Sequence, residues 1–409
     1  MTKSDRQCAF CARERKEVHQ LVAGPGVAIC DRCVHVCRDL LDEALQKDDA
    51  RVLPGGAPST KFSTPKEIVE HLDAYVIGQT RAKKILAVAL YNHRKRVRWA
   101  GEGKKSIEIQ KGNVMIVGPT GSGKTHLVRT LAKILDVPFA ESDANSLTQA
   151  GYVGEDVESI LVKLLRAAKG DVEAAERGIV YIDEIDKIAR REGAEQRDVG
   201  GEGVQQALLK IVEGSKAEFR VGVASNGTGG EVVRMNTSDI LFVVSGAFAG
   251  LKKISAEKER GSYGATIGFG CHGVLGGLDG LRSEDFFRFG MLPEFMGRFP
   301  ILVATDALDV PAISQILTEP KNALLRQYEV LFRRSGGSLC ATSSGIEEIA
   351  HAAVRQGTGA RALRGLLEGL LLDAMFECPS HPGGTYVLDQ AAVQGGRARR
   401  EEPAATASS

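Results

Sequence analysis

Eight consecutive residues have the composition of a phosphate-binding loop. The run GPTGSGKT occupies residues 118–125, after an apolar run that predicts a buried strand and before a predicted helix. The glycines let backbone N–H groups converge on phosphate oxygens at a helix N-terminus. Lys124 should reach the β- and γ-phosphates, and the Thr125 hydroxyl should ligate Mg²⁺. The predicted nucleotide-binding residues are Gly118, Pro119, Thr120, Gly121, Ser122, Gly123, Lys124, Thr125 and His126.

A second motif, GIVYIDEID, supplies two carboxylates at the end of an apolar run. Asp183 there can hold Mg²⁺, mostly through water, and Glu184 can orient and deprotonate an attacking water. An Asp-Glu pair after a strand is commonly a loop with solvated charges. Together with the phosphate-binding loop, however, it predicts ATP hydrolysis, in which catalysis is mostly positioning and charge stabilisation.

Two Cys-x2-Cys pairs, Cys8 with Cys11 and Cys30 with Cys33, are separated by 18 residues. Four thiolates at this spacing predict a closed tetrahedral Zn²⁺ site, and a closed site is structural because it leaves no coordination position open. Cys37 is predicted to be a small packing residue rather than a ligand. Few basic residues in excess and almost no aromatic residues favour protein binding by this module over nucleic-acid binding.

The stretch AGYVGEDVES carries a tyrosine and a valine between two glycines. The loop itself has no base, nucleophile or metal ligand, and glycines on both sides disfavour core packing. From the residues alone it is interpreted as a turn between helices with a half-buried tyrosine.

Composition excludes several classes of protein. With 43% hydrophobic and 26% charged residues, the 409-residue chain resembles ordinary globular proteins. The net charge of +1 gives no global indication of a nucleic-acid or membrane partner. No apolar signal core and no membrane-spanning run is found, so a cytoplasmic location is expected. The basic run HRKRVRW is predicted to be a solvated helix face or a subunit contact. No arrangement of serine, cysteine and histidine suggests a peptidase.

Pattern and composition divide the chain into five parts. Residues 1–46 form the cysteine module, and residues 47–62, rich in Pro, Gly, Ser and Thr, are typical of a linker. Residues 63–305 alternate helical and strand patterns. Residues 306–391 are mostly helical, with one strand at TYVLD, and residues 392–409 are predicted to be a disordered tail.

Three apolar runs predict the strands that position the two motifs: NVMIVG, GIVYIDE and ILFVVSGAF. Buried strands separated by helices imply a parallel sheet with helices on both faces. The predicted fold class is therefore α/β, with an N-terminal four-cysteine zinc module, a large ATPase domain built on a P-loop parallel sheet, and a mostly helical small lid domain.

The four-cysteine module is followed, in order, by GPTGSGKT, AGYVGEDVES, VYIDEIDKI, GEGVQQALLK, GAFAGL, IGFG, LPEFMGRFP and GTGARALR. This series closely resembles the ClpX family, the ATP-driven unfoldase subunits of Clp proteases within the AAA+ superfamily. The likeness runs from about residue 8 to residue 388. It implies AAA+ large and small domains, a homohexameric ring around an axial pore, and ATP bound between neighbouring subunits.

The resemblance assigns roles to further residues near the nucleotide. Arg298, in EFMGRFP, matches the arginine finger that reaches the neighbour's nucleotide, and Arg361, in TGARALR, matches the sensor-2 arginine of the small domain. A cation supplied across the interface stabilises transition-state charge only in an assembled ring. Val76 and Ile77 match the apolar pocket around adenine, and ordinary core packing is the open alternative.

Two loops acquire roles from the same resemblance. GYVG matches the loop that grips substrate in the pore, where a bulky, weakly selective wedge between glycines suits the pulling of arbitrary polypeptide. IGFG matches the loop that docks into apolar clefts of a ClpP-type peptidase. RREGAEQRD occupies the place of a second pore loop and is shorter than expected. The residues concerned are Gly151, Tyr152, Val153 and Gly154 for the pore, and Ile267, Gly268 and Phe269 for docking.

One stretch departs from the family pattern. ClpX-like chains carry an Arg-Lys-His loop at the pore entrance, where this chain has Ser225, Asn226 and Gly227. Loss of these positive charges should weaken the steering of negatively charged C-terminal tails. We therefore expect a variant or paralogue with altered substrate choice and an intact motor.

The predicted function is that of an ATP-dependent protein unfoldase and translocase that feeds a ClpP-type peptidase. It would use ATP, Mg²⁺ and Zn²⁺, would engage substrates and adaptors through the zinc module, and would have no nucleic-acid or membrane partner. A stand-alone remodelling ATPase is one alternative, against which IGFG argues. A zinc-ribbon adaptor with a nucleotide switch is another, against which Glu184, Arg298 and GYVG argue, because a switch needs no pore loop.

Overall fold

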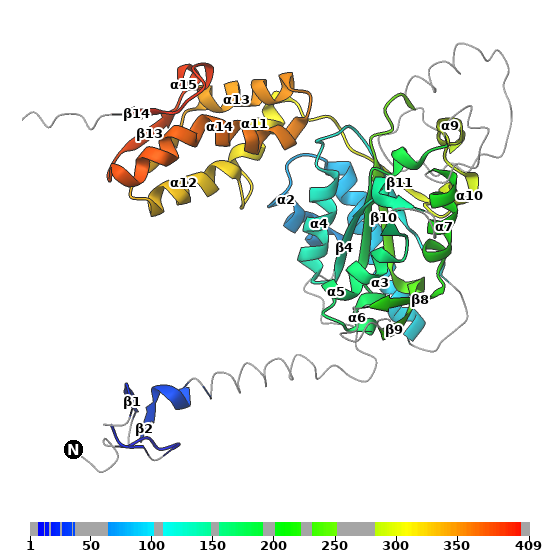
Figure 1. Ribbon diagram of the computed structural model, residues 1–409, viewed down its shortest axis with the longest axis horizontal. Helices are drawn as coiled ribbons and strands as arrows, with labels where there is room; N and C mark the ends of the chain where they lie inside the picture. The colour runs from blue at the N-terminus through cyan, green and yellow to red at the C-terminus, as the bar shows by residue number, and fades with distance from the viewer. Residues whose placement is uncertain are drawn as a thin grey trace, which may run out of the picture. The chain divides into compact units, whose positions relative to one another are not determined.

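A computed structural model describes the chain in two compact units, Met1–Lys61 and Phe62–Ser409 (Figure 1). The described residues are 7–11, 13–15, 18–24, 27–34, 36, 64–101, 109–148, 155–190, 201–221, 231–251 and 283–401. Within these ranges, no helix combines the length and apolar character needed to cross a bilayer.

The first unit is built on a β-hairpin. Strands β1 (Leu21–Gly24) and β2 (Val27–Cys30) pair antiparallel, with Leu21 opposite Cys30. Residues 31–34, directly after β2, are helical. The N–H of Ala9 donates to the carbonyl of Ala28 at 2.7 Å, which attaches the first cysteine turn to β2. Both cysteine pairs are therefore fixed by the same strand.

The second unit contains a five-stranded parallel sheet. Its spatial order is β11-β3-β10-β7-β4, so the first strand along the chain lies between the last two. Parallel strands end at one edge, where ligands of open α/β sheets bind. The strands are β3 (Val114–Val117), β4 (Phe139–Asp143), β7 (Ile179–Asp183), β10 (Leu241–Gly246) and β11 (Ile301–Ala304).

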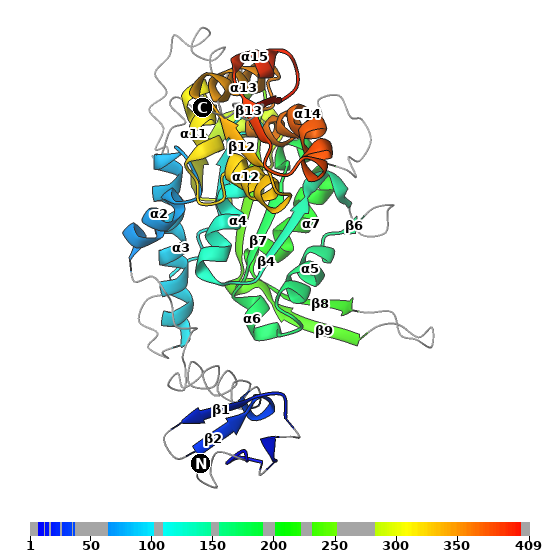
Figure 2. The same ribbon diagram turned by 90° about the vertical axis from the view of Figure 1, so that its left-hand side faces the viewer.

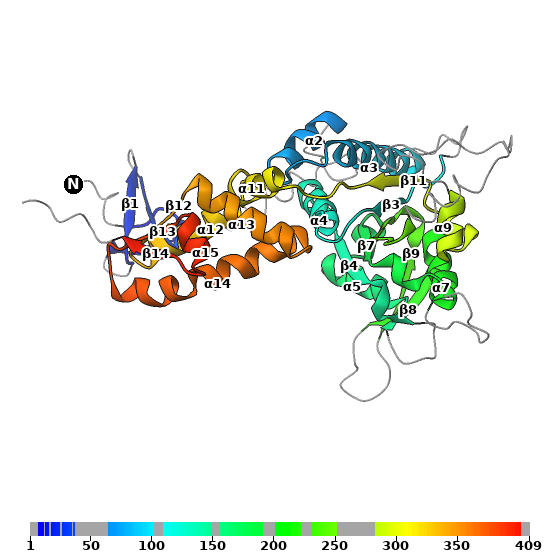
Figure 3. The ribbon, with the colours of Figure 1, turned by 90° about the horizontal axis from the view of Figure 1, so that it is seen from above.

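Helices cover both faces of this sheet (Figure 3), and its alternating side chains enter two apolar cores, one on each face. In β3, Val114 and Ile116 pack against one set of helices, while Met115 and Val117 pack against the other. The first face is covered by α2 (Pro65–Asp73), α3 (Thr80–Gly101) and α4 (Lys124–Leu135). The second face is covered mainly by α5 (Ser159–Ala167), α7 (Glu202–Glu213), α9 (Ser283–Phe289) and α10 (Pro293–Gly297).

Two strand pairs lie beside the main sheet. The short parallel strands β5 (Leu147–Thr148) and β6 (Glu155–Asp156) flank the GYVG loop, and β8 (Lys216–Val221) and β9 (Glu231–Asn236) form an antiparallel hairpin (Figure 2). The remaining elements of this region are η3 (Ala144–Ser146), α6 (Val172–Glu176), η4 (Ile185–Ile188) and η5 (Thr237–Asp239).

The basic run in α3 is only in part the solvated face that its composition predicts, since Lys95, Arg98 and Trp99 are exposed but other side chains are not. His93 is 7% exposed, and Arg96 donates to Asp239 Oδ1 at 3.0 Å and to the carbonyl of Ser238 at 2.9 Å. Burial, together with the nearby charges of Arg96 and Lys111, lowers the pKa of His93 to about 3. The run therefore includes two side chains that fasten α3 to η5 inside the unit.

Residues beyond β11 have a core of their own, formed by helices on a small sheet. The predicted strand TYVLD is β13 (Thr385–Leu388), paired parallel with β12 (Ser338–Ala341). Pro320 separates the first two helices, which the sequence pattern joins in one helical stretch. The helices are α11 (Val310–Thr318), α12 (Leu324–Arg334), α13 (Ser343–Arg355), η6 (Gly359–Arg361), α14 (Ala362–Glu377), η7 (Cys378–Ser380) and α15 (Gln390–Gln394).

The predicted disordered tail is wrong for residues 392–401. Residues up to Gln394 complete α15, and β14 (Arg399–Glu401) pairs antiparallel with β13, with Tyr386 opposite Arg400. The sequence RRE lacks the apolar pattern of a strand because all three residues are exposed at a sheet edge. Charged residues are common there because they oppose pairing with other chains. Residues 402–409 lie outside the described residues.

Candidate nucleotide and zinc sites

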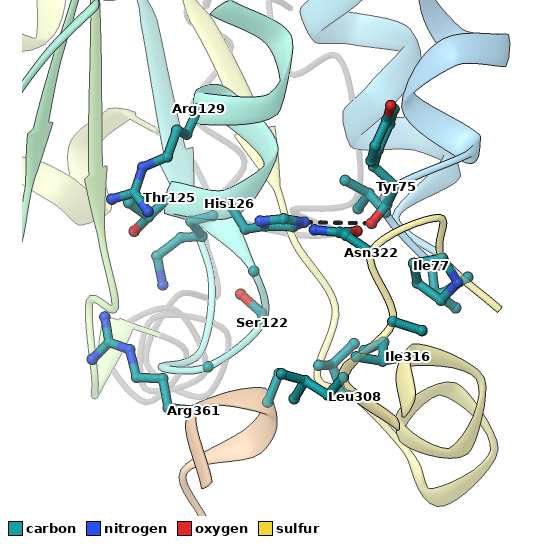
Figure 4. Close-up of a pocket in the computed structure, with 18 of the residues that line it drawn as sticks. Tyr75, Ile77, Ser122, Thr125, His126, Arg129, Leu308, Ile316, Asn322 and Arg361 are labelled. Carbon is teal, nitrogen blue, oxygen red and sulfur yellow. Dashed lines mark hydrogen bonds between the residues drawn. The ribbon is translucent and has the colours of Figure 1, made fainter. Parts of the chain in front are cut away.

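A cavity of about 370 Å³ opens beside the phosphate-binding loop (Figure 4). Its lining joins residues of the large sheet domain to residues that follow β11. In Figure 4, Thr125, Arg129 and Arg361 lie on one side of the pocket, and Leu308 and Ile316 lie on the other. One end is therefore charged and suits phosphates, whereas the other end is apolar and suits a base.

The lysine of the loop is held inside the pocket. Lys124 is 8% exposed, and its ammonium donates to the carbonyls of Gly118 at 2.6 Å and Pro119 at 3.0 Å. Burial lowers its pKa, and the carboxylate of Asp183 opposes this shift. These bonds hold the ammonium beside the loop. There it could exchange its carbonyl partners for the oxygens of a bound phosphate.

Glycine is required at one loop position by two separate constraints. Gly121 has φ +78°, and a Cβ there would lie 2.1 Å from the carbonyl oxygen of Thr358. The N–H of Ala360, in η6, donates to the carbonyl of Gly121 at 3.3 Å. The phosphate-binding loop therefore touches the turn that carries Arg361 directly, through backbone alone.

The two sequence motifs meet at Thr125 and Asp183. The Thr125 hydroxyl donates to Asp183 Oδ2 at 2.8 Å. The other carboxylate oxygen accepts from the hydroxyl of Ser245, which also lies 2.6 Å from the hydroxyl of Tyr181. Although burial raises the pKa of Asp183, the bonds from Ser245 and Thr125 outweigh it and lower the pKa below its ordinary value. An ionised carboxylate beside a hydroxyl is the donor set that fits Mg²⁺.

Glu184 lies at the strand end in a left-handed conformation, with φ +57°. Its carboxylate accepts a 2.8 Å hydrogen bond from the amide of Asn145, a residue of η3 that the motifs do not include. Glu184 and Asp183 also line a second, polar cavity that adjoins the first through Arg129 and Arg361. A water in that cavity would be within reach of the Glu184 carboxylate.

The two arginines assigned from the family pattern lie in different places. Arg361 approaches the site, with its Nη2 4.0 Å from Asp183 Oδ2. Of the described arginines, Arg129 and Arg361 line the two cavities, whereas Arg298 caps the C-terminal end of α10 and pairs with Glu213 at 2.6 Å. The structure therefore brings Arg361, but not Arg298, to the nucleotide site of its own chain.

The apolar end of the pocket includes both residues expected around adenine. Val76 and Ile77 line it together with His126, whose Nε2 lies 3.4 Å from the carbonyl oxygen of Tyr75. Val76 is also 6% exposed and belongs to the core under α2 and α3. Core packing and pocket lining are therefore both properties of Val76.

Gln79 is a further residue that motif reasoning missed. Its amide exchanges two 2.9 Å hydrogen bonds with the backbone of Asp306 and donates to the carbonyl of Ser122 at 3.4 Å. It thus ties the start of α3 to the phosphate-binding loop and to the segment after β11. Two consecutive positive φ angles, at Gly78 and Gln79, place the amide there. Its sequence signal is a single amide after a glycine, which is too common to be recognised.

The four predicted zinc ligands converge in the first unit. Among the described residues, Cys8, Cys11, Cys30 and Cys33 are the group whose ligand atoms could hold a metal, and these atoms all lie within 4.8 Å of one another. A tetrahedral Zn²⁺ site with Zn–S bonds near 2.3 Å needs sulfurs about 3.8 Å apart. Cys11 Sγ and Cys30 Sγ are 3.7 Å apart, so the cluster fits the metal.

Local backbone groups also favour thiolate at this cluster. Although burial raises the pKa of Cys8, N–H groups of Cys11 and Cys30 outweigh it and lower the pKa to about 6. Burial and the neighbouring thiols raise the pKa of Cys33. Four sulfurs so close together would repel as thiolates, and a bound dication removes that repulsion. The predicted four-cysteine zinc site is thereby confirmed.

Several predicted residues lie outside the described residues. They are Cys37, the linker 47–62, the pore-loop residues 151–154, residues 191–198 of the second pore loop, the entrance residues 225–227 and the docking residues 267–269.

Fold and site together define an AAA ATPase that carries a four-cysteine zinc module. A family model for the AAA domain (Cdc48 subfamily) matches residues 109–302, and one for the ClpX C4-type zinc finger matches residues 6–43. The proteins named ATP-dependent Clp protease ATP-binding subunit ClpX from Borrelia duttonii and Borrelia recurrentis are each 45% identical over 378 residues, covering 91% of this chain and 87% of theirs. The chain belongs to the ClpX family.

Proposed function

We propose that this protein is an ATP-driven unfoldase and translocase that delivers protein substrates to a ClpP-type peptidase. Membership of the ClpX family supports the class of activity. The observation that carries the proposal is the 2.8 Å bond between Thr125 and Asp183 beside the buried Lys124, because it joins the two motifs across the two adjoining cavities. ATP is then the fuel and polypeptide is the substrate.

Each side chain of the pocket has a task that follows from its position. Lys124 leaves the carbonyls of its loop for the β- and γ-phosphates, and Thr125 and Asp183 hold Mg²⁺, the second mostly through water. Bound Mg²⁺ supplies neutralising charge to the phosphate oxygens. Glu184 orients the attacking water and accepts its proton. Arg361 connects the nucleotide to the turn at η6 and thereby to the residues after β11.

Arg298 acts in this proposal on the nucleotide of a neighbouring subunit. Its absence from the linings of both described cavities supports an action across an interface. Its guanidinium, half exposed beside Glu213, is accessible to a neighbour. This assignment and membership of the family support a homohexameric ring with one site per interface.

The pore loop is proposed to be the gripping element. Residues 151–154 are joined to the described fold by β5 and β6, whose pairing brings Leu147 opposite Glu155. β5 directly follows η3, whose Asn145 bonds to Glu184. This short connection supports coupling between hydrolysis at Glu184 and movement of Tyr152 and Val153.

In this proposal the peptidase binds the loop at residues 267–269, and substrates and adaptors bind the zinc module. Phe10, Val22 and Val27 of that module are 71%, 55% and 57% exposed, which supports protein contacts there. The cluster of unoxidised cysteines suits a reducing compartment such as the cytoplasm.

The proposal is tested by ATP-dependent loss of fluorescence from a stably folded, degron-tagged fluorescent protein. Glu184→Gln should abolish the loss by stopping hydrolysis, and Tyr152→Ala should abolish it while ATP is still consumed. Glu173→Gln, an exposed acid in α6, is the matched control. Hydrolysis without unfolding of either N- or C-terminally tagged substrate would contradict a translocase. Capture of a ClpP-type peptidase that depends on Phe269 then separates delivery to a protease from stand-alone remodelling.

A further inference from the structure

Gln205 is a fully buried amide that joins three segments. Its side chain is 0% exposed, and its Nε2 donates to the carbonyl of Ile188 at 2.8 Å and to that of Gly290 at 3.3 Å. Its Oε1 accepts from the N–H of Leu292 at 2.9 Å. All three partners are backbone groups, so this side chain satisfies backbone groups of two segments that lie far apart in the sequence.

The joined segments carry the two ends of the proposed catalytic interface. Ile188 is the last residue of η4, which begins directly after Glu184. Gly290 and Leu292 precede α10, the five-residue helix whose C-terminal cap is Arg298. Gln205 thus lies between the strand end that serves the chain's own nucleotide and the helix that presents Arg298 to a neighbour.

The junction around this amide is tightly packed. Gly290 has φ +108°, and a Cβ there would lie 2.4 Å from the carbonyl oxygen and 2.8 Å from the nitrogen of Arg190. The N–H of Arg190 donates to the carbonyl of Gly290 at 2.9 Å. Because the two backbones touch, the entry to α10 cannot shift without breaking contacts to the segment after η4.

The helix that carries Gln205, α7, also contacts the C-terminal end of α10. Glu213, the last residue of α7, accepts from Arg298 Nη2 at 2.6 Å and from Nε at 2.9 Å. Both side chains are about half exposed, so the pair orients the guanidinium more than it stabilises the fold. The amide of Asn113 donates to the carbonyl of Arg298 at 3.0 Å, which fixes its backbone.

The two sides of the junction are held unequally. β7 pairs with β10 on one side and β4 on the other, and Asp186 of η4 accepts from the N–H groups of Ala247 and Phe248 at 3.2 and 3.3 Å. The entry to α10 has no strand partner in the described fold. Its backbone bonds to α9, from the N–H groups of Gly290 and Met291, are local, and its bonds to distant segments are those to Gln205 and Arg190. Removing the amide should therefore displace α10 rather than η4.

We propose that Gln205 is a positioning residue for Arg298. In this proposal α7 holds α10 at both of its ends, through Gln205 at the entry and Glu213 at Arg298, and so places the guanidinium for contact with the neighbouring subunit's nucleotide. This inference rests on the proposed action of Arg298 across a subunit interface. Gln205 touches neither nucleotide nor substrate in this assignment.

The test separates the chain that donates the arginine from the chain that hydrolyses ATP. Full-length Glu184→Gln supplies a finger but does not hydrolyse, and full-length Arg298→Ala hydrolyses but supplies no finger. Mixed rings of the two should regain ATPase activity. Gln205→Met, of nearly equal volume, is then added to one partner at a time. Gln206→Met in the donor is the matched control, because Gln206 is exposed and contacts Glu202 of its own helix.

Gln205→Met in the donor chain should lower the ATPase rate of the mixed ring by about 10- to 100-fold, the effect of a small misplacement of a catalytic group. The same change in the hydrolysing chain, and Gln206→Met in the donor, should leave the rate within about twofold of the unsubstituted pair. Equal loss in both chains, loss confined to the hydrolysing chain, or no loss in either would overturn the inference.

Two further results keep the test decisive. If Gln205→Met prevents ring assembly, as measured by light scattering, Glu213→Gln replaces it, because this exposed change at the other end of α7 leaves the buried junction intact. A donor-specific fall supports the inference, and an unchanged rate overturns it. If the unsubstituted pair fails to complement, the proposed action of Arg298 across the interface is itself wrong, which is distinguishable from a failure of Gln205.

Discussion

The amide of Asn145 donates a 2.8 Å hydrogen bond to the carboxylate of Glu184. Asn145 belongs to η3, and its own N–H donates to Asp143 Oδ1 at 2.8 Å, so the end of β4 fixes the amide. A general base must have both the right orientation and the right basicity. Asn145 sets the orientation, because it fixes one carboxylate oxygen and leaves the other available to water.

Asn145→Ala should therefore lower kcat for ATP hydrolysis by about tenfold, because Glu184 loses its orientation. The KM for ATP should change little, since Asn145 does not line the nucleotide cavity. Steady-state ATPase kinetics check the split. Ser146→Ala, which removes a side chain of the same turn that bonds to the backbone of Asp143, serves as control. An unchanged kcat in Asn145→Ala would show that the bond has no part in catalysis.

The approach of the phosphate-binding loop to η6 gives a second prediction. Gly121→Ala places a Cβ 2.1 Å from the carbonyl oxygen of Thr358, so η6 and Arg361 must move away from the pocket. Affinity for ATP should fall by about tenfold or more, in a titration with a fluorescent analogue. Gly170→Ala is the control, because its φ of +89° imposes similar strain with open space around the Cβ. Equal affinities of the two variants would refute the steric argument.

Buried His93 predicts a pH dependence of stability. Burial lowers its pKa to about 3, whereas an unfolded histidine titrates near 6.5. Below pH 6.5 the unfolded state therefore binds more protons, and the free energy of unfolding falls as the pH falls. The loss attributable to His93 is at most about 1.4 kcal/mol per pH unit. His93→Gln should reduce this slope in urea denaturation between pH 7 and 5, a window chosen to lie above most carboxylate titration.

The charged groups facing His93 sharpen the comparison. Arg96 and Lys111 add to the cost of protonating the imidazole, and the backbone of Asp239 opposes it. His351→Gln, at an exposed position of α13, should retain the wild-type slope. Parallel slopes for wild type and His93→Gln would mean that His93 titrates normally in the folded protein.

The central strands of the sheet could be predicted from the sequence, but its edges could not. β3, β7 and β10 are continuous apolar runs because helices cover both of their faces. β4 reads FAESD, with two of its three acidic or polar side chains exposed at the edge, and it shows no such run. β11 is four residues long and also lies at an edge. The motifs therefore located the catalytic edge without defining the whole sheet.

Motif residues of the site were predictable because chemistry restricts their types and spacing. Lys124, Thr125 and Asp183 lie together as the two motifs imply. Gln79 and Gln205, by contrast, act through single amides on backbone groups up to 227 residues away in the chain. Such a contact produces no characteristic spacing of residue types in the sequence, because it depends on which loops the tertiary structure brings together.

Loss of the metal should unfold the zinc module without changing the ATPase activity of the second unit. In a structural site, the free energy of metal binding is folding free energy, so Cys11→Ser should remove zinc and unfold the four-cysteine module. ATP hydrolysis by residues 62–409 should stay within about twofold, because that unit has its own cores. Zinc content by mass spectrometry and ATPase rate are measured together. The Cys37→Ser variant should keep its zinc. If this variant loses zinc, Cys37 belongs to the ligand set.

The hairpin β8–β9 gives the last prediction. Its paired strands bring Val221 opposite Glu231, and the connecting residues include Ser225, Asn226 and Gly227, where the resemblance to ClpX predicts a basic triplet. Replacing these three by Arg, Lys and His adds positive charge where substrate tails would enter. A field of opposite sign raises the rate of encounter with a C-terminal carboxylate degron, so the apparent KM for such a substrate should fall by about threefold or more.

The electrostatic origin of that effect can be isolated. Raising the ionic strength should cancel most of the gain, because a Debye length of about 8 Å at physiological salt shortens as salt is added. The KM for a substrate with an N-terminal degron, and the ATPase rate without substrate, should stay unchanged, because neither depends on steering a carboxylate. If the triplet leaves the KM for the C-terminal degron unaltered at low salt, the altered entrance loop does not determine substrate choice.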